Sequence, residues 1–229
     1  MRSALCATRY AKIDELNPNL GIIKNIELKF NRMNYLAHLY LSFNDEEIMV
    51  GNFIADAVKG RQLEGYPEKI RAGIKLHRLI DEFTDRHPLV EVSKSRIREN
   101  YRKYSGVVVD MYFDHFLAAN WHDFSDETLL HFTRNSYKML FRHYVQMPPR
   151  MKRILPLMAA GNWLNSYAKT DNISLALQGM SRRTKFISGI ENGGTDLKIH
   201  YTELEDDFRN FFPELMAFSR SFLTKESVL

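Results

Sequence analysis

The amino-acid sequence predicts an all-α fold in a single domain, and three observations support this prediction. Alternating, strand-like patterns are scarce, and the run GVVVDMYF at residues 106–113 is the one ambiguous case. Helix start and stop signals recur along the chain, and no internal repeat or low-complexity linker divides it. The 229 residues, 45% of them hydrophobic and 12% aromatic, suffice to bury the core of one medium-sized domain.

In the first half of the chain, capping residues and prolines set the helix boundaries. Asn34 is placed to cap a helix in the segment MNYLAHLYLS, and Pro67 stands at a helix opening. Pro88 ends the helical segment after His87, because proline disfavours a helical conformation in the residue before it. From these signals we expect helices at residues 34–42, 46–60, 67–86, 89–104 and 106–121.

The second half of the chain is divided in the same way. Ser125 precedes one helix, the proline pair at 148–149 opens the next, and Asn172 caps a third. The glycine pair at 193–194 precedes the last helix, which Pro213 kinks or splits. We expect these helices at residues 126–146, 149–167, 172–184 and 196–223.

Net charge alone says little about partners. The formal charge is +4, but residues 1–32 hold six basic and three acidic residues, which leaves 26 basic and 25 acidic residues in the remainder. Local clusters must therefore carry any electrostatic argument. Cys6 is the only cysteine, so neither an internal disulfide nor a cysteine-based zinc site can form, and a reducing, cytoplasmic setting fits.

The amino-terminal segment predicts neither export nor a membrane partner. Charge and polarity resume after a short apolar patch, before a secretory signal could form. No run approaches the ~18 apolar residues of a membrane-spanning helix. The segment from Met33 resembles a natural start, so we expect residues 1–32 to be an extension that need not be native and residues 33–229 to form the domain.

The segment HRLIDEFTDRHP at residues 77–88 carries a column of ligand-type side chains. His77, Asp81 and Asp85 are four residues apart and share one helix face. Imidazole nitrogen with carboxylate oxygen suits manganese, iron or zinc, whereas an all-oxygen set suits magnesium or calcium. The alternative is a solvated face on which these acids pair with Arg78 and Arg86.

The segment DMYFDHFLAANW also carries ligand-type side chains four residues apart, here among apolar residues. Asp110 and Asp114 lie four residues apart, and two acids in so apolar a stretch need a cation. That cation is either a metal ion or an arginine such as Arg78 or Arg98. His115 points about 100° away from Asp114 and is placed to approach a substrate or to orient a ligand.

Two earlier segments add a histidine and an acid. His38 lies in an apolar helix, where a hydrogen-bonded core histidine is the alternative, and Asp56 stands among apolar residues in GNFIADAVKG. A metal centre inside a helical bundle is the simplest single explanation for acidic and histidine side chains in several apolar helices. The Glu-x-x-His pairs of di-iron bundles and the His-Glu-x-x-His protease helix are absent, which leaves a hydrolytic site in which a metal polarises a phosphoryl oxygen.

Six segments occur in the order found in one known family. They are MNYLAHLYLS, GNFIADAVKG, GIKLHRLIDEFTD, DMYFDHFLAANW, GMSRR and HYTELEDDFRNFFPEL. With them the chain resembles the acyl-carrier-protein phosphodiesterases, relatives of the HD-type metal-dependent phosphohydrolases, from Met33 to about Leu223. Some relatives have histidine where this sequence has Tyr40, two residues after His38.

The resemblance implies an all-α bundle like that of HD phosphohydrolases. It implies hydrolysis of the phosphodiester that joins 4′-phosphopantetheine to a serine of holo-acyl carrier protein, with Mn²⁺ as the expected ion and Mg²⁺, Fe²⁺ or Zn²⁺ as alternatives. The implied metal-site residues are His38, Asp56, His77, Asp81 and Asp114. Asp56 and His115 are the expected catalytic residues.

An acidic substrate protein would need basic groups near the metal. Three clusters are available: Lys94, Arg96, Arg98, Arg102 and Lys103; Arg150, Lys152 and Arg153; and Arg182, Arg183 and Lys185. Each either steers an acidic partner or forms a solvated helix face. We assign Arg182 and Arg183 to phosphate contact and Arg78 to substrate binding.

Two other functions stay open on the sequence. An HD-like phosphohydrolase of a small nucleotide or phosphoester would use the same metal with a different pocket. A non-catalytic helical interaction module would use its acids only to pair with arginines. We expect no nucleic-acid partner, and the sequence leaves the oligomeric state open.

Overall fold

The computed structural model describes residues 34–182 and 188–226, and these form helices and no strand. The α-helices are α2 (Tyr35–Tyr40), α3 (Glu46–Ile54), α4 (Glu68–Arg86), α5 (Pro88–Tyr101), α6 (Ser105–Ala119), α7 (Leu129–Arg142), α8 (Pro149–Ala160), α9 (Trp163–Ser166), α10 (Thr170–Ser181), α11 (Gly193–Ile199) and α12 (Tyr201–Lys225). Short 3₁₀ helices connect several of them, among them η2 (Ala55–Ala57) and η3 (Gly60–Gly65). The predicted all-α, single-domain fold is confirmed.

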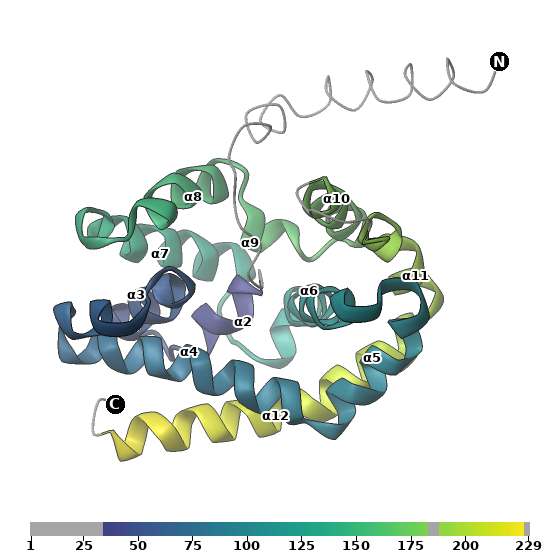
Figure 1. The fold of residues 1–229 in the computed structure, drawn as a ribbon, viewed down its shortest axis with the longest axis horizontal. Helices are drawn as coiled ribbons and strands as arrows, with labels where there is room; N and C mark the ends of the chain where they lie inside the picture. The colour runs from purple at the N-terminus through teal and green to yellow at the C-terminus, as the bar shows by residue number, and fades with distance from the viewer. Residues whose placement is uncertain (1–33, 183–187, 227–229) are drawn as a thin grey trace.

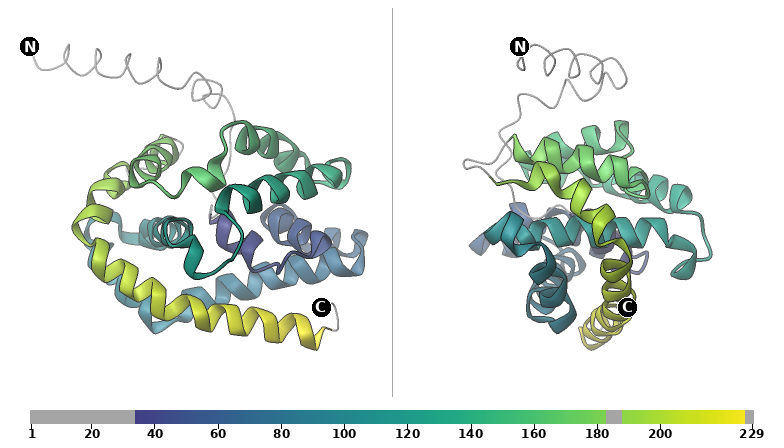
Figure 2. Two further views of the ribbon diagram at one scale, coloured as in Figure 1. Left: turned by 180° about the vertical axis from the view of Figure 1, so that it is seen from behind. Right: turned by 90° about the vertical axis from the view of Figure 1, so that its right-hand side faces the viewer.

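The short helix α2 lies in the middle of the bundle, between α3 and α6 (Figure 1). The long helices α4, α5 and α12 pack along one side, where α12 contacts both α4 and α5 (Figure 2). Most of α2 is buried because it is apolar on all sides. None of the described helices is long and apolar enough to cross a membrane.

Several predicted boundaries are confirmed and others are wrong. The ambiguous run at 106–113 lies inside α6, where surrounding helices bury it. The predicted helix at 149–167 is interrupted at Asn162, which adopts a left-handed conformation with φ of 46°. The helix expected at 46–60 ends at Ile54 and continues as η2. These breaks depend on tertiary packing, which local signals do not report.

The last helix is not split at Pro213, whereas the alternative prediction of a kink there stays a prediction. Helix α12 runs without interruption through this proline, and the break falls at His200 instead, between α11 and α12. Phe211, Phe212 and Leu215 flank the proline and are almost fully buried. Their burial contributes more than the roughly 3 kcal/mol that a proline costs inside a helix. The glycine pair at 193–194 lies in the first turn of α11 rather than before a helix.

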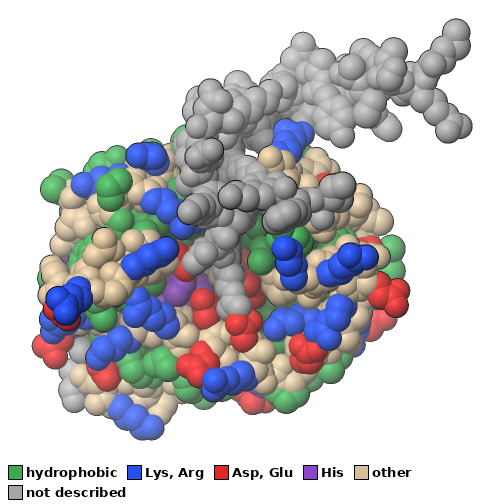
Figure 3. Space-filling model, in the orientation of Figure 1, with side chains coloured by type: hydrophobic (Ala, Val, Ile, Leu, Met, Phe, Trp, Pro, Cys, Tyr) green, Lys and Arg blue, Asp and Glu red, His purple; other side chains and the backbone are tan. Residues whose placement is uncertain are grey.

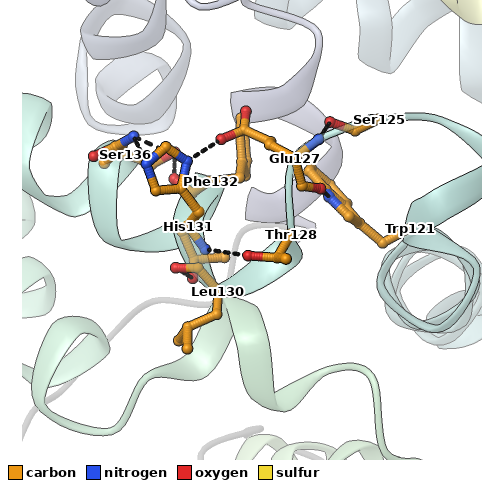
Figure 4. Close-up of polar contacts among 10 residues, drawn as sticks. Trp121, Ser125, Glu127, Thr128, Leu130, His131, Phe132 and Ser136 are labelled. Carbon is orange, nitrogen blue, oxygen red and sulfur yellow. Dashed lines mark hydrogen bonds and ion pairs between the residues drawn. The ribbon is translucent and has the colours of Figure 1, made fainter.

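Two predicted helix caps are also corrected. At the start of α7, the hydroxyl of Thr128 accepts the backbone N–H of His131 at 3.2 Å, whereas Ser125 forms only a turn with the N–H of Glu127 (Figure 4). The Glu127 carboxylate also holds the His131 ring at 2.6 Å. Asn172 lies inside α10, and its side chain donates to the carbonyl of Ser166, outside the helix.

Helices α3 and α4 cross at a pair of glycines. A Cβ atom on Gly51 would lie 2.1 Å from the carbonyl oxygen of Ile70, and one on Gly73 would lie 2.2 Å from that of Ile48. Any side chain at either position would therefore push the two backbones apart. This close crossing brings residues 48–52 of α3 against residues 70–74 of α4.

Candidate metal centre

Three predicted ligands from two helices meet at one point. His77 and Asp81 lie one turn apart on α4, and His38 comes from α2. One ligand atom from each of the three lies within 4.8 Å of the others. The Nε2 atom of His38 is 3.4 Å from Oδ1 of Asp81, and Nε2 of His77 is 3.7 Å from Oδ2 of Asp81. The two imidazole rings stack with centroids 4.0 Å apart.

A fourth predicted residue, Asp56 of η2, reaches the same cluster. Its Oδ1 atom lies 3.6 Å from Nε2 of His77. The side chain of Asp56 is 12% exposed and that of Asp81 24% exposed, whereas the two histidines are almost fully buried. Asp81 is therefore the most exposed member of the cluster.

The histidine nitrogens in this cluster fit a metal ion. Within the described ranges, Nε2 of His38 and both ring nitrogens of His77 are buried and make no hydrogen bond. Their separations from the carboxylates are too long for hydrogen bonds. Two ligand atoms that each lie about 2.1 Å from one ion are roughly 3.0 to 3.4 Å apart, so the histidine-to-carboxylate separations of 3.4 to 3.7 Å are close to those around a bound ion. Mixed nitrogen and oxygen donors suit manganese, iron or zinc.

Asn52 orients His38, and the sequence did not single it out. Its Nδ2 group donates to the carbonyl of His38 at 2.7 Å, so its Oδ1 atom faces Nδ1 of the same histidine at 2.9 Å. Nδ1 must then carry the proton, and the lone pair of Nε2 points toward Asp81. Asn52 is four residues before Asp56, so the shared helix face was the signal that could have identified it.

Asp114 is placed differently from the other predicted ligands. Its two carboxylate oxygens accept the backbone N–H groups of Leu36 and Ala37 at 3.0 and 2.9 Å, at the amino terminus of α2. Asn34 occupies the cap position of that helix but makes no capping bond, so Asp114 satisfies these amides in its place. Its predicted role as a metal ligand stays a prediction.

The pKa of Asp114 is strongly shifted. Burial raises this pKa to about 7, against the backbone hydrogen bonds from Ala37 and Leu36 and the nearby His38, which lower it. The neighbouring acid Asp110 raises it further. Burial therefore favours the protonated form of Asp114 more than it would be favoured in a solvent-exposed aspartate.

His115 points away from Asp114, as its position on the helix predicts. Its Nδ1 lies 2.8 Å from the carbonyl oxygen of Tyr167, and its Nε2 lies 3.1 Å from the hydroxyl of Tyr201. Burial lowers the pKa of this histidine. Its expected catalytic role stays a prediction. Tyr40, which stands where some relatives have histidine, donates its hydroxyl to the carbonyl of Phe124 at 2.6 Å.

The arginines expected to bind substrate lie in different settings. Arg78 is exposed beside His77 and donates to the carbonyl of Val58 at 3.1 Å, which ties α4 to the loop that follows Asp56. Arg182 is exposed at the end of α10, and Arg183 lies outside the described residues. Their contacts with substrate stay predictions.

Much of the first basic cluster is engaged with acids. Arg96 pairs with Asp207 at 2.5 Å, and Arg98 pairs with Glu91. Lys94 lies 3.5 Å from Asp85, which belongs to the outer end of the column on α4. Of the arginines in the solvated-face alternative, Arg86 pairs with Glu82 at 2.7 Å and Arg78 donates to Val58, so that alternative stays a prediction for Asp85. His77 and Asp81 lie in the candidate metal centre. Figure 3 shows histidine and acidic side chains next to one another on one face of the molecule, with Lys and Arg side chains nearby.

Comparisons with known proteins point to one family. A family model described as "Acyl carrier protein phosphodiesterase" matches residues 33–215. A protein of that name from Yersinia pestis is 34% identical over 185 residues, which cover 80% of this chain and 96% of the relative. Proteins of the same name from Shigella boydii serotype 18 and Enterobacter sp. strain 638 are 34% and 33% identical over 186 residues, or 81% of this chain and 96% of each relative. No solved structure matches the chain.

Proposed function

Because the chain belongs to the acyl carrier protein phosphodiesterase family, we propose that it is a metal-dependent phosphodiesterase of holo-acyl carrier protein. Its substrate is the phosphodiester between 4′-phosphopantetheine and a serine of the carrier protein. Water adds to phosphorus, the bond to the serine oxygen breaks, and that oxygen takes up a proton. The products are apo-acyl carrier protein and 4′-phosphopantetheine.

One observation supports metal dependence above the others. Buried imidazole nitrogens of His38 and His77 make no hydrogen bond in the described part of the chain, and two carboxylates lie within 3.7 Å of them. A buried polar group without a partner is costly, so a protein that retains several in one place needs a ligand there. We propose Mn²⁺, and Fe²⁺, Zn²⁺ or Mg²⁺ are the alternatives.

His38, His77, Asp56 and Asp81 would hold the ion, and their own chemistry determines what each contributes. A divalent ion in this cluster supplies Lewis acidity and lowers the pKa of a water molecule. Asn52 keeps the Nε2 lone pair of His38 directed into the cluster. The Oδ1 atom of Asp56 lies 3.6 Å from Nε2 of His77, and we assign to Asp56 the acceptance of a proton from the attacking water. We propose His115 as a second residue that carries a proton during the reaction.

The protein partner is proposed from charge. Acyl carrier proteins are small and acidic, and α8 carries three basic residues near its start, Arg150, Lys152 and Arg153. Complementary charge speeds association and weakens with salt. We therefore expect the KM for the carrier protein to rise with ionic strength while kcat changes little. A cytoplasmic location fits this partner.

Mass spectrometry of holo-acyl carrier protein tests the proposed function. We expect the wild-type protein with Mn²⁺ to remove the phosphopantetheine arm and Asp81→Asn to leave it in place. An intact carrier protein after incubation with the wild type would contradict the substrate. Turnover of a free nucleotide under the same conditions would instead indicate a small-molecule phosphohydrolase, and no turnover together with no metal binding would indicate an interaction module.

A further inference from the structure

One face of α7 exposes apolar and basic side chains together. Leu130 and Phe141 are 39% and 42% exposed, and Val145, just beyond the end of the helix, is 85% exposed. Arg134 and Lys138 are also exposed, and they lie on the same helix face as Leu130 and Phe141 because these four residues are three or four positions apart. We call these five residues the α7 surface.

The basic residues of the α7 surface have no acidic neighbours along the chain. Residues 128–170 hold seven Lys and Arg residues and no Asp or Glu, although the whole chain has 28 acidic residues. Arg134 and Lys138 form no ion pair with any described residue, in contrast to Arg142, which pairs with Glu46 at 2.7 Å. Their charges are therefore available to the carboxylates of a partner.

Internal contacts hold the apolar part of the α7 surface in place. The ring of Phe141 stacks on that of Tyr144, with centroids 6.1 Å apart. The hydroxyl of Tyr144 donates to the backbone carbonyl of Lys152 at 3.0 Å, which ties the end of α7 to α8. The two helices lie side by side in the bundle (Figure 1). A surface that is already ordered loses little conformational entropy when a partner binds.

The end of α7 is attached to the helix that leads to the metal centre. Arg142 and His143 lie 2.7 and 3.0 Å from the carboxylate of Glu46, the first residue of α3. Helix α3 has nine residues, so it is about 14 Å long, and it ends where η2 with Asp56 begins. An ordinary protein interface covers about 800 Å² of each partner, a patch roughly 30 Å across. A single partner protein is therefore large enough to contact both places.

We propose that the α7 surface docks the acidic carrier protein while its phosphodiester lies at the metal centre. This inference rests on the proposed function and adds a protein-recognition surface to it. Arg134 and Lys138 pair with carboxylates of the carrier protein, and the contact removes Phe141 and Val145 from water. Residues 1–32 of this chain do not complement the α7 surface, because they hold six basic and three acidic residues.

Apo-acyl carrier protein, the proposed product, tests docking without turnover. It is titrated calorimetrically into Mn²⁺-loaded wild type, Lys138→Glu and Phe141→Ser. The matched controls are Lys225→Glu, which reverses an exposed charge on α12, and Val92→Ser, which removes a 43% exposed apolar side chain from α5. All four changed side chains are exposed, so every variant should fold as the wild type does.

The expected losses of affinity follow from charge and from apolar contact. Lys138→Glu should weaken binding at least about 10-fold, because the reversed charge repels an acidic partner. Phe141→Ser should weaken it about 5-fold, because it removes an aromatic side chain from the contact. Both controls should match the wild type. Wild-type affinity in either test variant, or equal losses in the controls, would overturn the proposal.

Turnover separates this inference from the proposed function. Lys138→Glu and Phe141→Ser should raise the KM for holo-acyl carrier protein with little change in kcat. Both should hydrolyse the small phosphodiester bis(4-nitrophenyl) phosphate as the wild type does, because this compound needs no protein contact. If the wild type is active and both variants keep its KM, only the docking proposal fails. If the wild type leaves the holo-protein intact while binding of the apo-protein depends on Lys138 and Phe141, the proposed reaction fails and the docking surface stands.

A membrane surface is the competing partner for basic and apolar side chains. Sedimentation with phosphatidylglycerol vesicles is measured for the wild type and Phe141→Ser. We expect no difference between the two proteins. Vesicle binding that is lost in Phe141→Ser, together with unchanged binding of the carrier protein, would assign the α7 surface to a membrane and overturn the proposal.

Discussion

Two clusters of buried polar side chains differ in how their polar atoms are satisfied. Between α5 and α12, Asp207 accepts the hydroxyl of Ser93 at 2.7 Å and a guanidinium N–H of Arg96 at 2.5 Å. At the metal centre, by contrast, His38 and His77 lie 3.4 to 3.7 Å from their carboxylates, and three of their ring nitrogens make no hydrogen bond with any described residue.

The difference separates a structural role from a ligand-binding role. The Asp207 cluster is satisfied by the protein itself, so its contacts hold α5 against α12. The His38 and His77 cluster is not, so its stabilisation depends on a group that the protein must bind. Changes in the first cluster should reduce stability and spare activity. Changes in the second should remove metal binding and activity and spare the metal-free fold.

The largest effect is expected at Asp81, because it faces both histidines of the centre. Asp81→Asn should lower Mn²⁺ affinity and kcat/KM by more than about 100-fold, since even residues that only support a ligand cost roughly 10- to 100-fold. Calorimetry and the carrier-protein assay measure the two losses. The metal-free melting temperature should not fall. Retained activity, or a destabilised metal-free protein, would remove the distinction between the clusters.

The reciprocal change is Asp207→Ala. It leaves Ser93 and the partly buried Arg96 without their acceptor, so the free energy of unfolding should fall by about 1–3 kcal/mol. Urea denaturation measures this loss, and kcat/KM at a temperature where the variant is folded should be unchanged. Asp206→Ala, which alters an exposed neighbour, is the control and should change stability by less than about 0.5 kcal/mol. A loss of Mn²⁺ binding in Asp207→Ala would argue against the comparison.

Asn52 tests whether orientation of His38 matters at the centre. Asn52→Ala removes the acceptor of the Nδ1 proton and should lower Mn²⁺ affinity by roughly 10- to 100-fold. Calorimetric titration of the variant against the wild type gives this ratio. If the variant binds Mn²⁺ as tightly as the wild type, the ring of His38 is positioned by packing alone.

Asp114 combines features of both clusters, because backbone amides satisfy it while burial raises its pKa to about 7 from an ordinary value of 3.8. The folded protein therefore holds this proton more tightly than the unfolded chain does. The contribution of protonated Asp114 to the free energy of unfolding is fully present below about pH 4 and is lost as the pH rises to about 7. Asp114→Asn does not titrate, so its metal-free melting temperature should fall less steeply between pH 4 and pH 7. Parallel pH profiles for both proteins would contradict this assignment.

The sequence predicts most of the centre because helix spacing and apolar context are local properties. His77 and Asp81 share a face by their spacing of four, and His38 and Asp56 stand out among apolar neighbours. Asn52 was not predicted because its amide contacts His38, which lies on a separate helix, α2. The capping of α2 by Asp114 likewise arises only when distant segments meet.

Local signals fail at the helix boundaries for a related reason. Pro213 has the residue type that breaks helices, yet the burial of neighbouring aromatic residues keeps α12 continuous. The crossing of α3 and α4 at Gly51 and Gly73 is equally invisible to a local pattern. The all-α class is predictable because the prediction rests on many local signals along the chain. The prediction of a single helix boundary rests on only a few of them.

Direct titration of metal-free protein with Mn²⁺ tests the central claim that the four side chains converge on one divalent ion. We predict saturable binding of one ion per chain in the wild type and no measurable binding in a variant that carries His77→Gln and Asp81→Asn together. Undiminished binding in the double variant, or none in the wild type, would contradict the account.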